Sequence, residues 1–241
     1  MRVQRGRLRY CPSVLAVVLA ATAPLARASA EGDLFDQLYQ RGQKQNGALR
    51  TLTASFTETT TSELLTRPLT ARGTVAVERP SRVALKYSEP DERLVIIDGD
   101  RLRVIWPARA VRQTRDIGAA QRRVQKYFVD SSPSELRTHF DIAARAVTDP
   151  AGYQITLLPK RRQIRDGLIR LDLWIDPESL LMTSMKMTFP NGDTKLMTFS
   201  NVQTNVVIDP AVFSIPHSAP VTRRFSGALE AAGLADGLTR R

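Results

Sequence analysis

The sequence predicts a mainly β protein with a few helical segments, folded as an antiparallel barrel or sandwich of roughly ten strands. Short stretches in which apolar and polar residues alternate fill most of the 241-residue chain, as in strands with one buried face. Turn residues separate these stretches, and helical spacing occurs in only a few places. So many short antiparallel strands in one domain usually curl into a barrel or split into two packed sheets.

The first 30 residues predict a secretory signal peptide. Arg2, Arg5, Arg7 and Arg9 precede an apolar run at residues 14–26, and Ala28-Ser29-Ala30 forms an A-x-A cleavage site. A membrane anchor is the alternative, but the run is shorter than the ~20 residues that a bilayer span needs. The only cysteine, Cys11, lies in this segment. A mature chain starting at Glu31 would therefore lack disulfides and thiolate metal sites.

The net charge of +11 overstates how basic the mature protein is. Five arginines and no acidic residue lie in residues 1–30, which leaves +6 for the mature chain. Residues 31–216 are long enough for one domain with a substantial core, and residues 217–241 are expected to form a flexible tail. Export argues against a nucleic-acid partner, whereas a membrane surface or an acidic protein partner stays open.

The first elements in the chain are a helix and a strand. Leu34 and Leu38 predict an amphipathic helix over residues 31–50, although Gly42 and Gly47 weaken it. From Leu52 the apolar residues recur at every second position, which predicts a half-buried strand. The segment TSELLTRPLT that follows is expected to be a loop, because Pro68 is unsuited to a central strand.

An antiparallel meander is expected next, because turns at Pro80-Ser81, SEPDE and Asp98-Gly99-Asp100 separate short apolar-faced segments. The residues expected to share one face are Gly73, Val75, Val77, Val83, Leu85, Tyr87, Leu94, Ile96, Leu102, Val104 and Trp106. A helical insert in two pieces is predicted over residues 118–140, with Val124, Phe128, Leu136 and Phe140 at helical spacing and Pro133 near the start of the second piece.

Strands are expected to resume after this insert, from FDIAARAV to DTKLMTFSNVQTN. Leu171, Leu173 and Ile175 line one side of one strand, and Met185, Met187 and Phe189 line another. Asn191-Gly192-Asp193 is typical of a hairpin turn. DPAVFSIP closes the body of the protein.

Catalytic and metal-binding patterns are weak in this sequence. His139 and His217 lack the spacing of metal ligands, and no serine lies in a G-x-S-x-G motif. Asp98 and Asp100 fit a hairpin turn better than a calcium site or a catalytic pair of carboxylates. A protein that is not an enzyme and needs no cofactor is therefore expected, with an unrecognised hydrolase as a minor alternative.

Three segments together resemble the LolA-type periplasmic carriers of outer-membrane lipoproteins. They are LTASFTET at residues 52–59, GTVAVERPSRVALKY at residues 73–87, and LVIIDGDRLRVIWP at residues 94–107. DPAVFSIP is similar to the closing segment of that family. The resemblance extends over residues 33–216.

This resemblance implies an incomplete, unclosed antiparallel β-barrel of about ten to eleven strands with a helical lid over an apolar acyl-chain cavity. Arg79 matches the strand-end arginine that ties the lid shut and is needed to pass cargo on. Val83 stands where some relatives have an aromatic residue. The lid positions would be Val124, Phe128, Leu136 and Phe140. The cavity lining would be Phe56, Val75, Val77, Val83, Leu85, Tyr87, Leu94, Ile96, Leu102, Val104, Trp106, Leu171, Leu173, Met185, Met187 and Phe189.

The function implied is that of a monomeric periplasmic carrier that moves lipoproteins from the inner to the outer membrane. An inner-membrane transporter complex would load it, and an outer-membrane receptor would unload it. Two alternatives remain: a paralogue that carries another lipid or acyl compound, and a lipid-sensing interaction module of the cell envelope.

Overall fold

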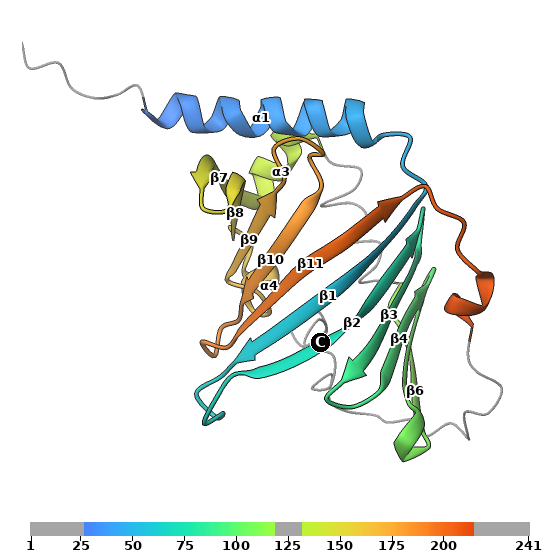
Figure 1. Ribbon diagram of the computed structural model, residues 1–241. Helices are drawn as coiled ribbons and strands as arrows, with labels where there is room; N and C mark the ends of the chain where they lie inside the picture. The colour runs from blue at the N-terminus through green and yellow to red at the C-terminus, as the bar shows by residue number, and fades with distance from the viewer. Residues whose placement is uncertain (1–26, 119–131, 215–241) are drawn as a thin grey trace, which may run out of the picture.

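The computed structural model describes residues 27–118 and 132–214. They form eleven strands, three α-helices and two short 3-10 helices (Figure 1). The elements are α1 (Arg27–Asn46), β1 (Thr51–Thr61), β2 (Leu69–Glu78), β3 (Arg82–Glu89), β4 (Arg93–Asp98), β5 (Arg101–Trp106), η1 (Pro107–Arg109), β6 (Val111–Asp116), α3 (Pro133–His139), β7 (Phe140–Thr148), β8 (Ala151–Pro159), α4 (Arg162–Arg165), β9 (Arg170–Ile175), β10 (Met182–Thr188), β11 (Thr194–Thr204) and η3 (Pro210–Phe213).

All eleven strands belong to one sheet in the order β6-β5-β4-β3-β2-β1-β11-β10-β9-β8-β7. Every neighbouring pair is antiparallel, and β1 joins the two halves of the sheet by pairing with β11. The outermost strands, β6 and β7, are not paired with each other, so the sheet is curved but unclosed (Figure 1). The predicted incomplete antiparallel barrel is therefore confirmed.

One face of the sheet, called here the inner face, carries most of the large buried apolar side chains, although Ile96 and Ile105 are buried on the other face. The inner face includes Phe56 of β1, Tyr87 of β3, Met197 of β11 and Leu171 of β9. Strand residues point alternately to the two faces, and the pairing register aligns these apolar positions from strand to strand. The inner face is therefore largely apolar from β5 to β7.

Helices α1 and α3 cover the β7–β10 part of the inner face (Figure 1). Phe35 and Leu38 of α1 and Leu136 of α3 are buried against strand residues such as Ile155 and Leu157. Ser132 caps α3 and forms a reciprocal capping box with Glu135, which fixes the helix start predicted at Pro133. None of the helices in the described ranges is long and apolar enough to cross a membrane.

The opposite, outer face carries the end of the described chain. Phe213 of η3 is buried against Ala76 of β2 and Ala84 of β3, whose small side chains leave room for the ring. The Arg82 guanidinium lies 5.2 Å from the centre of the same ring. The described part of the closing segment, residues 209–214, thus packs on the outside of the sheet.

Two expectations need correction, and one strand was missed. Leu94 and Ile96 lie on the outer face, because β4 pairs with β3 so that Val95 and Ile97 point inward. Phe140 belongs to β7 and not to a helix, since α3 ends at His139 and Phe140 has extended backbone angles. Strand β6 was not predicted from the sequence, because its polar residues show no apolar alternation.

Other expectations lie wholly or partly outside the described residues. The positions Val124 and Phe128 lie there, as do the apolar run of the signal peptide and the tail at residues 217–241. Helix α1 begins at Arg27 and ends at Asn46, so it spans the predicted cleavage site and stops short of Arg50.

Candidate functional site

The candidate site is the inner face of the half of the sheet that β1–β6 form, where β1–β5 and the adjoining β10 and β11 supply the side chains. Its buried centre comprises Ala54, Phe56, Ala71, Val75, Tyr87, Val95, Val104 and Met197. Its half-buried margin comprises Leu52, Val77, Val83, Leu85, Leu102, Trp106, Met185 and Phe199. We call these sixteen residues the β1–β6 cluster.

This cluster differs from the core under α1 in what covers it. In the described ranges, all its members come from strands, whereas the core under α1 includes Phe35, Leu38 and Leu136 from helices. The larger side chains of its margin, such as Leu85, Leu102 and Trp106, remain partly accessible to solvent. A broad apolar surface that retains this exposure is suited to a non-polar ligand.

Phe56 and Tyr87 form the aromatic centre of the cluster. Their rings meet edge to face, with centroids 5.0 Å apart. They pack across Gly73, which lies between them in the sheet at a point where the β2–β3 register shifts. A Cβ atom at Gly73 would lie 2.8 Å from the Phe56 ring and 2.2 Å from the Lys86 carbonyl oxygen. The absent side chain of Gly73 therefore allows this aromatic pair.

A group of polar side chains interrupts the apolar surface. The buried carboxylate of Glu58 accepts a hydrogen bond from the Tyr87 hydroxyl at 2.8 Å and pairs with the Lys195 ammonium at 3.0 Å. The Arg93 guanidinium lies 3.9 Å from the centre of the Tyr87 ring. Burial, together with the Glu58 charge, raises the pKa of Tyr87 far above its ordinary value, so its hydroxyl stays protonated. We call Glu58, Tyr87, Arg93 and Lys195 the inner polar group.

Polar contacts hold α1 over the other half of the inner face. Near its middle, Asp36 pairs with Arg137 of α3 at 2.6 Å. Near its end, Gln45 and Asn46 donate hydrogen bonds to the carbonyl oxygens of Glu178 and Ser179, between β9 and β10. The helix is thus anchored at its middle and at its C-terminal end, as well as by its buried apolar side chains.

Fourteen of the sixteen predicted lining residues lie on the inner face, and they divide between the two clusters. The β1–β6 cluster contains Phe56, Val75, Val77, Val83, Leu85, Tyr87, Leu102, Val104, Trp106 and Met185. The core under α1 contains or contacts Leu171, Leu173, Met187 and Phe189, and Met185 contacts both. The other two, Leu94 and Ile96, lie on the outer face.

Arg79 lies in the turn between β2 and β3, where its side chain is exposed. Its backbone N–H donates to the Arg50 carbonyl oxygen at 2.9 Å, which ties this turn to the segment between α1 and β1. Within residues 27–118 and 132–214, its guanidinium makes no hydrogen bond or ion pair. The role of Arg79 in holding a lid stays a prediction.

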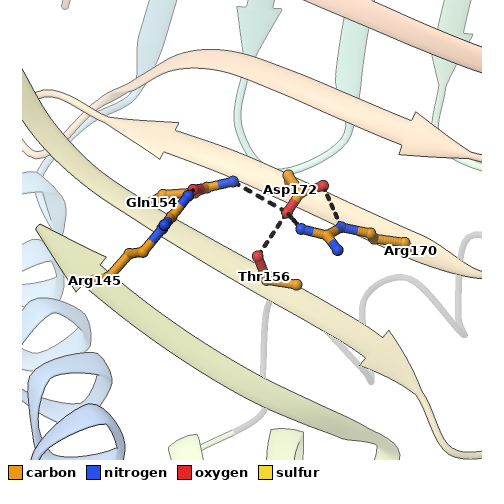
Figure 2. A network of polar contacts seen from close by, with 5 residues as sticks. All are labelled: Arg145, Gln154, Thr156, Arg170 and Asp172. Atoms are coloured by element: carbon orange, nitrogen blue, oxygen red, sulfur yellow. Dashed lines mark hydrogen bonds and ion pairs between the residues drawn. The ribbon is translucent and has the colours of Figure 1, made fainter. Parts of the chain in front are cut away.

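A polar network on the outer face of β7, β8 and β9 was not predicted (Figure 2). The buried Asp172 carboxylate accepts hydrogen bonds from Arg170 at 2.7 and 2.8 Å, Thr156 at 2.6 Å and Gln154 at 3.3 Å. Arg145 donates in turn to the Gln154 side-chain oxygen. Burial would raise the pKa of Asp172, but the bonds from Arg170 and Thr156 outweigh it and lower the pKa.

Sequence reasoning also missed the inner polar group. The alternation of β1 does place Glu58 on the same face as Phe56, but only the β1–β11 pairing brings Lys195 to it. In the described ranges, no three His, Cys, Asp or Glu residues are grouped to hold a metal ion. The expected absence of a catalytic centre is not tested by this arrangement.

A family model and a curated relative point to the same family. The family model "Outer membrane lipoprotein carrier protein LolA" matches residues 47–216. An outer-membrane lipoprotein carrier protein of Chromobacterium violaceum is 24% identical over 205 residues, which cover 83% of this chain and 89% of that protein.

Solved structures that are similar to this chain have low sequence identity to it. An uncharacterized conserved protein from Thermus thermophilus has a TM-score of 0.51 and 9% identity, over 80% of this chain and 99% of that one. A LolA superfamily protein from Nitrosomonas europaea has a TM-score of 0.39 and 9% identity, over 73% and 96% of the two chains.

Proposed function

Because this chain belongs to the LolA family of outer membrane lipoprotein carrier proteins, we propose that it carries lipoproteins across the periplasm. Family membership supports a lipoprotein or lipid carrier role in general. In our proposal, the acyl chains of the cargo pack against the β1–β6 cluster and are shielded there from water. A carrier of this kind needs no catalytic residues.

The observation that carries this proposal is the half-exposed apolar margin of the β1–β6 cluster. Val77, Val83 and Leu85 adjoin one another on β2 and β3, and Leu102 and Trp106 extend the surface to β5. Apolar side chains left partly in water gain free energy when a hydrocarbon chain covers them. A ligand made of acyl chains matches the apolar chemistry of this surface.

The strength of such binding has to be limited in a carrier. Burying a 16-carbon chain completely would contribute about 12 kcal/mol, at ~0.8 kcal/mol per CH₂ group. That energy corresponds to roughly nanomolar affinity for one chain, and a cargo with three chains would not leave. We therefore propose partial burial of the chains, with helical segments that compete with the cargo for the inner face.

The proposed cycle has two partners. An inner-membrane transporter complex would load the cargo, and an outer-membrane receptor would remove it. Arg79 is proposed to stabilise the empty, covered state through its exposed guanidinium. A carrier for another lipid or acyl compound is the second candidate, because the β1–β6 cluster offers an apolar surface and no feature that requires the protein part of a lipoprotein.

A fluorescent fatty-acid probe tests the proposed site directly. We expect the wild-type protein to bind the probe, and Val83→Asp to weaken binding roughly tenfold or more by placing a charge against the chain. Thr74→Asp is the matched control, because Thr74 lies on the outer face of the neighbouring strand. Equal binding by both variants would rule out the inner face as the site.

The cargo itself can be identified by mass spectrometry of the protein purified from a periplasmic extract. Co-purified lipoprotein supports the lipoprotein carrier. Free lipid without lipoprotein supports the second candidate. A preparation that contains neither and does not bind the probe argues against both.

A further inference from the structure

The loop between β1 and β2 exposes leucine side chains to water. Leu64 is 92% exposed, Leu69 is 52% exposed and Leu65 is 41% exposed. The loop has a defined turn, in which the Leu65 N–H donates to the Ser62 carbonyl oxygen at 3.1 Å and the Leu64 N–H to the Ser62 hydroxyl at 3.2 Å. Single exposed leucines are ordinary on protein surfaces, but two in one ordered loop and a third, Leu69, at the start of β2 indicate a contact surface.

This loop lies at one end of the sheet, which we call the leucine end. Thr61, the last residue of β1, pairs with Thr194, the first residue of β11, so the β10–β11 turn lies beside the loop. Figure 1 shows the loop in cyan and this turn in orange at the lower left. The β8–β9 connection reaches the same end through the pairing of β9 with β10, and it contributes Ile169, which is 40% exposed.

The leucine end is also basic. The β8–β9 connection, residues 160–169, contains Lys160, Arg161, Arg162 and Arg165 but only one acidic residue, Asp166. The Arg162 side chain is 88% exposed and lies 4.0 Å from the Asp166 carboxylate. Lys160 pairs with Asp141 of β7 at 3.0 Å. These two carboxylates offset two of the four cations and leave an excess of positive charge. Lysine and arginine side chains close to an anionic lipid surface are attracted to it.

We propose that the leucine end docks on a membrane surface that contains anionic phospholipid. Leu64 and Leu65 enter the interface between headgroups and acyl chains, and the arginines of the β8–β9 connection contact the phosphates. A fluid bilayer accepts protruding side chains without a shaped pocket, whereas a protein partner would need a complementary hollow for each. The inference concerns the outside of the protein, so it does not depend on acyl chains binding to the inner face.

Co-sedimentation with lipid vesicles tests the proposal, using the protein recovered after export. We expect binding to vesicles of phosphatidylcholine mixed with phosphatidylglycerol, and weaker binding to phosphatidylcholine alone. The double variant Leu64→Ser/Leu65→Ser should lower the partition coefficient roughly tenfold or more, and Arg162→Glu/Arg165→Glu should remove the preference for the anionic lipid.

Val207→Ser is the control, because Val207 is a fully exposed apolar residue just past the end of β11, at the opposite end of the sheet. It should bind vesicles as the wild type does. The proposal fails if the wild-type protein does not sediment with anionic vesicles, if the leucine variant binds as well as the wild type, or if neutral vesicles bind equally well. None of these vesicle results depends on whether the fatty-acid probe binds, so the docking proposal and the carrier proposal are tested separately.

Discussion

Phe56 and Tyr87 meet edge to face across a glycine, with 79° between their ring planes. Phe56 lies on β1 and Tyr87 on β3, so the contact passes over β2 at Gly73. The Tyr87 hydroxyl continues to Glu58, which in turn pairs with Lys195. One missing side chain on β2 thus permits a chain of contacts that links β3, β1 and β11.

Replacing Gly73 should be costly. A methyl group there would overlap the Lys86 carbonyl oxygen and crowd the Phe56 ring, and backbone atoms cannot move aside cheaply. We expect Gly73→Ala to lower the free energy of unfolding by about 2 kcal/mol or more, as measured by urea denaturation. Gly42→Ala is the control, because no atom lies within 4 Å of the added carbon in helix α1, and it should stabilise the protein by about 0.5–1 kcal/mol. Equal stability of the two variants would show that the aromatic pair does not require glycine.

The Glu58 and Lys195 side chains should contribute to stability cooperatively, so that removing one charge costs more stability than removing both. Both side chains are more than nine-tenths buried, so Lys195→Met leaves a buried carboxylate without its cation. We expect that single variant to lose about 3–5 kcal/mol of stability. The double variant Glu58→Gln/Lys195→Met should be more stable than Lys195→Met alone, because the glutamine oxygen still accepts from Tyr87 and carries no charge. Losses that simply add in the double variant, measured by chemical denaturation, would contradict this coupling.

Asp172 should make the stability depend on pH in the acidic range. Its pKa is lower in the folded protein than the value near 3.9 of an unfolded chain. The unfolded chain therefore takes up a proton first, and stability falls as the pH drops from about 4 through the folded pKa. We expect Asp172→Asn to be less stable at pH 7 by roughly 1–2 kcal/mol, since it loses the charge-assisted bonds from Arg170. The difference from the wild type, followed by thermal unfolding at several pH values, should shrink below about pH 4.

A second variant separates the charge of Asp172 from its hydrogen bonds. Thr156→Ala keeps the carboxylate and removes a 2.6 Å bond to it, so it should lose less stability at pH 7 than Asp172→Asn. The difference in stability between Asp172→Asn and the wild type should therefore change with pH. If that difference stayed constant from pH 7 to the acidic range, the network would not shift the pKa of the Asp172 carboxyl group.

Most of the inner face could be predicted from the sequence, because the alternation of apolar and polar residues shows which side chains of a half-buried strand face the core. Phe56, Val75 and Leu85 have polar or small neighbours, so their face is unambiguous. The strand RLVIID is apolar on both faces, since Ile96 is buried on the outer face and Val95 on the inner one, and alternation cannot choose between them. The turn at Gly99 and the pairing with β3 make that choice.

Contacts between distant strands could not be predicted in this way. The meeting of Glu58 with Lys195 depends on β1 pairing with β11, and that of Gln154 with Asp172 depends on β8 pairing with β9. Strand β6 is an edge strand with polar residues on both faces, so it has no apolar period to detect. Pairing partners, which a single sequence does not encode as a local pattern, determine both polar clusters.

Arg79 provides the last prediction, because its backbone joins the β2–β3 turn to the segment after α1 while its side chain remains exposed. The LolA resemblance implies that this arginine holds the covering helices by hydrogen bonds and is needed for cargo release. Arg79→Leu should leave the thermal unfolding temperature within a few degrees of the wild type, since an exposed side chain contributes little to stability. It should nevertheless slow the transfer of bound lipoprotein to outer-membrane fractions several-fold, because the covered state can no longer compete with the cargo.

Arg101→Leu is the matched control and should transfer cargo normally. Arg101 is also an exposed arginine, and it follows the β4–β5 turn at the same end of the sheet. Normal transfer by Arg79→Leu, with cargo loading intact, would remove this residue from the release step and leave its backbone contact to Arg50 as its structural role.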